Sequence, residues 1–208
     1  MVRTTLKAMT LVELMVAVSI MLIAMEGFTL LFLKSWDTNK FVLEEGMASS
    51  VASHSVSKII TELRSVRQAD NGDFPVESGS NFDLKVYIDI DDDGVTERVH
   101  YFLDLATDQL KVGVTNPVGT TPVSYPATDD TVTVLADYIV NENNNPAFFY
   151  YNKNYPGDTI NNPLTTPINV EDTRLIRVHL LVNIDPVHAP NNINIESFAD
   201  LRNLKTYE

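Results

Sequence analysis

The 208 residues suit one domain with an appendage, and a composition of 44% hydrophobic and 21% charged residues is typical of a folded chain. The net charge of −13 makes nucleic-acid binding a poor expectation, because backbone phosphates are repelled by so acidic a surface. The chain has no cysteine, which excludes disulfides, cysteine-ligated zinc and thiol nucleophiles.

The first predicted element is an apolar segment of 25 residues, Met9 to Leu33, in which Glu13 and Glu26 are the only ionisable residues. A helix of this length extends about 37 Å and can cross a bilayer core of about 30 Å. Arg3 and Lys7 precede it, which favours a cytoplasmic N-terminus. The sequence therefore predicts a single-pass membrane segment with the rest of the chain translocated.

A cleavable secretory signal shares the basic start and the apolar run. Two features argue against it here. The run is too long for the apolar region of a signal, and no small-x-small cleavage site follows it before Trp36. Glu13 also places a carboxylate in apolar surroundings, which is unfavourable unless the charge is paired or lies near the interface.

The stretch from Ala8 to Leu14, AMTLVEL, resembles the prepilin peptidase motif of type IV pilins and type II secretion pseudopilins. The resemblance implies cleavage between Ala8 and Met9, N-methylation of Met9, and pairing of Glu13 with the terminal amine of a neighbouring subunit during assembly. That pairing would compensate the charge of Glu13. The sequence departs from the family pattern at Ala8, where glycine is usual, and at Met9, where phenylalanine is usual.

The implied partners are other pilins or pseudopilins, prepilin peptidase and an inner-membrane assembly platform. The implied location is the inner membrane, with the body in the periplasm or outside the cell in a filament. No enzymatic activity, required cofactor or nucleic-acid partner is expected. A looser resemblance to the minor pilin W or pseudopilin J branch is carried by four stretches: Asp93 to Tyr101, Leu135 to Asn141, Phe148 to Tyr151, and Leu201 to Leu204.

A long helix is predicted to continue beyond the apolar segment, because no proline occurs before Pro75. Apolar residues recur at helical spacing from Ala52 to Val66, so we expect an amphipathic half that ends near Gln68 and has a break near Gly27 or Gly46. The predicted organisation is a leader (1–8), a membrane or filament-core helix (9–35), its amphipathic continuation (36–70) and a globular antiparallel β domain (71–208).

The alternation of apolar and polar residues predicts strands in the second half of the chain. The first three, joined by short turns, are expected to form an antiparallel meander. The predicted strands are 82–90, 95–103, 110–114, 132–135, 148–151 and 176–184. The overall prediction is an α+β, pilin-like fold in which the helix packs on an antiparallel sheet.

The turn after the first strand is a candidate metal site. Asp89, Asp91 and Asp93, followed by Gly94, match the opening of a calcium-binding loop, and Glu97 lies at its ninth position. Hard oxygen ligands at alternate positions can converge on one cation. The alternative is a plain acidic hairpin turn, because Asp-Gly between strands favours a type I′ turn.

Other residues bear on that choice. The twelfth position of the loop, where a bidentate glutamate belongs, is His100. Asp104, Asp129 and Asp130 are candidates for completing a cation site. The four histidines show no metal-binding spacing, and no catalytic motif is present. The alternative function is a membrane-anchored adhesin or ligand-binding protein that uses the Tyr- and Asn-rich loops between Tyr138 and Tyr155.

Overall fold

The computed structural model describes residues 9–120, 122–185, 192–201 and 204. Its contacts divide the chain into two compact units, Met1–Glu44 and Glu45–Glu208. The elements in chain order are α1 (Leu11–Leu63), β1 (Val76–Gly79), β2 (Asp83–Ile88), β3 (Glu97–Asp104), β4 (Gln109–Thr115), β5 (Thr131–Ala136), β6 (Phe148–Tyr151), the short 3₁₀ helix η1 (Val170–Asp172), β7 (Leu175–Val182) and β8 (Ile193–Asp200).

The first unit contains the apolar part of α1. It is long and apolar enough to cross a membrane. Its large apolar side chains are exposed on every side of the helix, as Leu14, Phe28 and Trp36 illustrate. The hydroxyl of Thr29 donates to the carbonyl of Met25, so this polar group is satisfied within the helix. The α1 segment of this unit therefore presents apolar side chains outward, as a membrane-spanning segment requires.

The helix is continuous from Leu11 to Leu63, so the predicted break at Gly27 or Gly46 is wrong. Glycine weakens a helix without ending it, because it keeps its backbone N–H and C=O bonds. The helix also ends five residues before the predicted end at Gln68. Val66 is still buried there, because the chain after the helix remains packed on the core.

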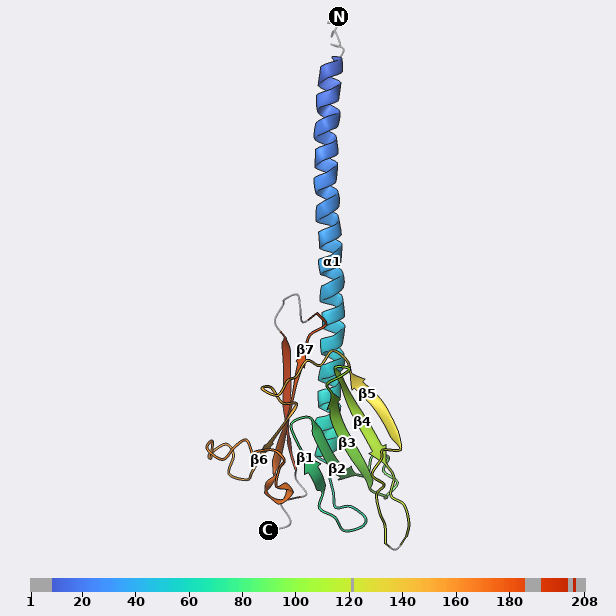
Figure 1. Cartoon of the computed structure of the whole chain (residues 1–208), viewed down its shortest axis with the longest axis vertical. Helices are drawn as coiled ribbons and strands as arrows, with labels where there is room; N and C mark the ends of the chain where they lie inside the picture. The colour runs from blue at the N-terminus through green and yellow to red at the C-terminus, as the bar shows by residue number, and fades with distance from the viewer. Residues whose placement is uncertain (1–8, 121, 186–191, 202–203, 205–208) are drawn as a thin grey trace, which may run out of the picture. The chain divides into compact units, whose positions relative to one another are not determined.

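The second unit contains two antiparallel sheets (Figure 1). The first has the order β1-β2-β3-β4-β5, and the second has the order β6-β7-β8. The predicted meander is confirmed, because β2, β3 and β4 pair antiparallel in sequence order, although the connection between β2 and β3 is longer than the predicted short turn. Together with α1, the sheets make the α+β architecture predicted from the sequence.

One hydrophobic core joins the helix and both sheets. Alternate residues of each inner strand point into it, as Val99 and Tyr101 of β3 do. The second half of α1 contributes a stripe spaced three or four residues apart, which matches the helical period. The buried residues of that stripe are Ala52, Val56, Ile59, Ile60 and Leu63.

Two strands were missed by the sequence prediction. β1 has only four residues and a register irregularity, and β8 alternates half-buried and exposed residues without a long apolar run. The predicted strands 132–135 and 148–151 are confirmed as β5 and β6, but they belong to different sheets. The Asn-rich stretch between them therefore crosses from one sheet to the other instead of closing a hairpin.

Candidate functional site

The first candidate site lies at the N-terminal end of α1. Ala8, on one side of the predicted cleavage point, lies outside the described residues, and Met9 is 62% exposed. A carboxylate oxygen of Glu13 accepts the backbone N–H of Thr10 at 2.8 Å and its hydroxyl at 2.9 Å. The Thr10 hydroxyl in turn accepts the N–H of Glu13 at 3.3 Å. These reciprocal bonds form a capping box, so Glu13 has a role within its own helix.

The second candidate site is the acidic loop, defined here as residues 89–96 between β2 and β3. It is much longer than a two-residue hairpin turn, and Asp93 is not among the residues with positive φ, so the predicted type I′ turn is wrong. The left-handed positions are Asp92, with φ 60°, and Gly94, with φ 93°. They let the loop curl so that its side chains fold back on its own backbone.

Asp89 organises the acidic loop. One of its carboxylate oxygens accepts the N–H of Asp93 at 3.1 Å, and the other accepts the N–H of Gly94 at 3.1 Å. Asp93 in turn accepts the N–H of Val95 at 2.8 Å. The short acidic side chains thus replace the ladder bonds that this segment lacks, which is the usual role of aspartate in turns.

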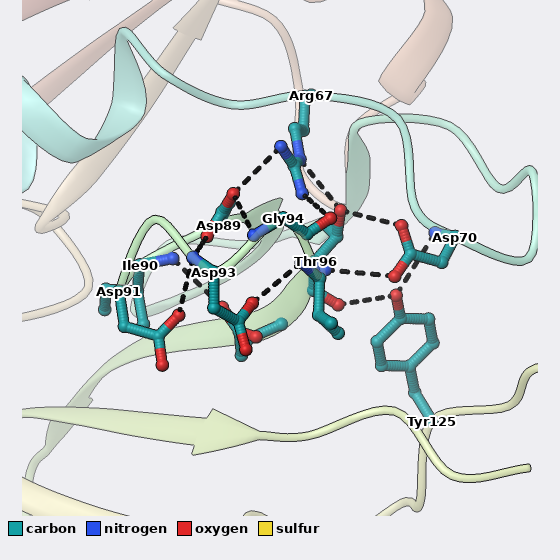
Figure 2. A network of polar contacts seen from close by, with 11 residues as sticks. Arg67, Asp70, Asp89, Ile90, Asp91, Asp93, Gly94, Thr96 and Tyr125 are labelled. Atoms are coloured by element: carbon teal, nitrogen blue, oxygen red, sulfur yellow. Dashed lines mark hydrogen bonds and ion pairs between the residues drawn. The ribbon is translucent and has the colours of Figure 1, made fainter.

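Arg67 and Asp70, from the segment after α1, bind the acidic loop from outside (Figure 2). The Arg67 guanidinium contacts Asp89 at 3.0 Å and donates to the Thr96 hydroxyl at 2.8 Å and the Gly94 carbonyl at 2.9 Å. The Asp70 carboxylate accepts the backbone N–H and the hydroxyl of Thr96, each at 3.0 Å. Arg67 therefore supplies a positive charge beside the acidic loop.

Three of the four predicted metal ligands lie together. Asp89, Asp91 and Glu97 each offer an oxygen within 4.8 Å of the others, whereas Asp93 is not part of this group. Burial raises the pKa of the Glu97 carboxyl, the hydrogen bond from the Ile90 N–H lowers it, and the charge of Asp91 raises it, with a net increase. Three hard oxygen donors suit calcium, but the Arg67 charge on Asp89 competes with a cation.

The residues considered for completing a cation site lie in other contacts. Asp104 binds Lys111 at 2.6 Å, and Asp130 accepts the backbone N–H of Asn116 at 2.8 Å. Asp129 lies 2.9 Å from His100. Among the residues that the structure describes, none of these three acids belongs to the carboxylate group of the acidic loop. The sequence could not decide this, because each acid is placed by strand register rather than by spacing.

Two side chains of the Tyr- and Asn-rich region support the fold. Asn141 is buried; its amide donates to the carbonyl of His179 at 3.0 Å and its oxygen accepts the N–H of Leu181 at 2.9 Å. The ring of Tyr155 packs on that of Tyr151 at 4.3 Å between centroids. Asn141 therefore joins the connection between the sheets to β7, and Tyr155 packs on β6, whereas Tyr138 is 51% exposed.

Sequence reasoning missed Arg67, Asp70, Thr96 and Tyr125. Tyr125 donates to the Thr96 carbonyl at 2.7 Å and accepts the N–H of Asp70 at 3.3 Å. The run of aspartates in the acidic loop was the one sequence signal for such contacts, since closely spaced carboxylates need a positive charge nearby. The identity of that counter-charge depended on contacts between residues 22 or more positions apart in the chain.

No protein-family model matches this chain, and comparisons with curated proteins and with solved structures found no similar protein. The pilin resemblance therefore rests on the N-terminal residues and on the looser body matches. It remains a prediction.

Proposed function

We propose that this chain is a minor pilin or pseudopilin, a structural subunit of a type IV pilus or of a type II secretion-like filament. The observation that carries the proposal is Glu13, a carboxylate near the start of a 25-residue apolar segment and five residues after a small residue, Ala8. An α+β body that includes the end of the same helix is compatible with such a subunit.

Assembly is the proposed mechanism. Prepilin peptidase would cut between Ala8 and Met9, and Met9 would be N-methylated. The mature subunit would then be stored in the inner membrane, with its body in the periplasm. An assembly platform would then move the helix into the filament. In that apolar core, Glu13 and a neighbour's terminal amine would each be unfavourable alone and compensated as a pair.

The capping box gives Glu13 a second explanation that the experiment must separate from the first. Glutamine at this position keeps the reciprocal bonds with Thr10, because Glu and Gln both serve in a capping box. Glutamine has no negative charge for an amine. The Glu13→Gln variant therefore removes the proposed assembly contact and retains the helix start, whereas Glu13→Ala removes both.

The test compares wild type with Glu13→Gln and Glu13→Ala in cells that assemble the filament. Sheared filaments and membranes are probed for this chain, and its mature N-terminus is read by mass spectrometry. We expect Glu13→Gln to remain in the membrane, trimmed to a methylated Met9, with filament content reduced about tenfold or more, the effect of losing one charge pairing. Normal incorporation of Glu13→Gln would refute the charge-pairing role, and a wild-type chain that retains Met1 would refute the pilin assignment.

A further inference from the structure

The outward face of the first sheet is covered by the loop between β4 and β5, whose described residues are 116–120 and 122–130. Tyr87 of β2 and Arg98 of β3 alternate with core residues and so point away from α1, yet they are only 2% and 3% exposed. The Tyr125 ring packs on Tyr87 at 4.9 Å, and the Asp129 carboxylate lies 3.6 Å from the Arg98 guanidinium. This β4–β5 loop therefore shields polar and aromatic side chains that the sheet alone would expose.

His100 lies between two carboxylates on that face. Its Nε2 is 2.6 Å from an oxygen of Asp83 on β2, and its Nδ1 is 2.9 Å from an oxygen of Asp129 in the β4–β5 loop. A neutral imidazole has one N–H donor, so its other nitrogen would direct a lone pair at a carboxylate. Only the imidazolium can donate to both oxygens. With both carboxylates ionised, the requirement for two donors is met only by a protonated His100.

The electrostatic surroundings agree with this requirement. Burial lowers the pKa of His100, but the hydrogen bonds and charges of Asp83 and Asp129 raise it, with a net increase above its ordinary value of 6.5. The ring also stacks on Phe102 at 4.6 Å. Among the described residues, the other charged groups on this face include Lys85 of β2, Arg98 and Asp104 of β3, Lys111 of β4, which contacts Asp104, and Glu77 of β1, which contacts Arg98.

Asp129 is positioned by close contacts with β4. A Cβ at Gly113 would lie 2.1 Å from the Asp129 carboxylate, so the carboxylate occupies space that only glycine leaves free. The Thr115 hydroxyl donates to the other Asp129 oxygen at 3.2 Å. Asp129 lies two residues before β5, an edge strand whose Val132 is 54% exposed. The start of β5 is also held by its pairing with β4 and by the Asp130 backbone N–H, which donates to the Val114 carbonyl at 2.9 Å, so Asp129 adds a side-chain contact to this backbone pairing.

We propose that His100, Asp83 and Asp129 form a proton-dependent latch that holds the β4–β5 loop and the start of β5 on the sheet. Loss of the imidazolium proton leaves one N–H, which we infer stays on Nε2, because its contact with Asp83 is the shorter of the two. Asp129 then loses the imidazole as a donor and keeps only the Thr115 hydroxyl and the more distant Arg98 guanidinium. The pKa of His100 is higher in the folded chain than its ordinary value, so the latch is fully closed below about pH 6.5 and is lost as the pH rises through the folded-state pKa. The latch belongs to the β domain and does not depend on filament assembly.

Hydrogen exchange of the full-length chain in detergent micelles tests this latch. Exchange is followed by mass spectrometry from about pH 6 to about pH 9 and corrected for the intrinsic pH dependence of exchange, while NMR follows the protonation of His100. We expect protection of Thr131–Val134 to fall about tenfold or more as His100 loses its proton, the effect of losing one charge-assisted hydrogen bond. The hydrogen bond from the Tyr125 hydroxyl to the Thr96 carbonyl also holds the β4–β5 loop. It should not change in this pH range, because burial raises the pKa of Tyr125 above 10.0.

Three variants make the result specific. His100→Gln and Gly113→Ala should each give low, pH-independent protection of β5; the first removes the titrating group and the second displaces Asp129 while leaving the His100–Asp83 contact in place. His54→Gln, at an exposed position on α1, should behave as wild type. Flat protection in wild type, or an unchanged pH dependence in either His100→Gln or Gly113→Ala, would overturn the proposal.

Discussion

Replacing Arg67 by methionine should open the acidic loop without unfolding the domain. Methionine keeps most of the apolar stem of arginine and removes the guanidinium. The guanidinium makes three contacts with the loop, to Asp89, Thr96 and Gly94, at 2.8 to 3.0 Å. The variant would remove the positive charge that contacts Asp89 beside Asp91 and Glu97.

The size of the effect follows from those contacts and their exposure. Hydrogen bonds to charged groups contribute about 1.5 to 3 kcal/mol each when the partner is buried. The Arg67 side chain is 35% exposed and that of Asp89 is 12% exposed, so water and salt replace part of the interaction. We therefore expect a loss of about 2 kcal/mol in the local free energy of opening, which is about 30-fold in the opening equilibrium.

Hydrogen exchange of full-length protein in detergent micelles measures this opening at the amides of Asp93 and Gly94, whose N–H groups donate to Asp89. Arg64→Met is the matched control, because it removes the same charge from an exposed neighbouring position. We expect about 30-fold faster exchange in Arg67→Met and no change in Arg64→Met. Equal exchange in the two variants would show that the acidic loop holds itself together without Arg67.

Two further predictions follow from the same structure. If Arg67 competes with a cation for Asp89, about 1 mM calcium should restore the hydrogen-exchange protection of the acidic loop in Arg67→Met and change that of wild type little. No calcium effect in either protein would reject the calcium prediction for Asp89, Asp91, Asp93 and Glu97. Burial, with the nearby charge of Glu62, raises the pKa of Tyr101 well above 10.0. Absorbance titration of the native chain to about pH 11 should therefore ionise fewer than its eight tyrosines, the remainder following on unfolding, and full native ionisation would contradict this.

Much of the architecture was predictable because it depends on periodic local patterns. The apolar run after Ala8 and the stripe from Ala52 to Leu63 have helical spacing, and α1 follows both. The strict alternation in β2 and β3 predicted the meander. β8 escaped prediction because its alternation of apolar and polar residues is short: Ile193 and Ile195 are followed by Ser197 on the same face, and Phe198 falls on the other face.

The sites divide in the same way. The sequence alone predicted that Glu13 lies in an apolar helix, and it offered Asp89, Asp91, Asp93 and Glu97 as one candidate group, because the relevant spacings are local. The structure brings three of these four carboxylates together and leaves Asp93 out. Only the tertiary structure decided that Arg67 neutralises Asp89 and that His100 joins Asp83 to Asp129. Those pairings depend on strand register and on how loops fold over a sheet, and long-range packing sets both.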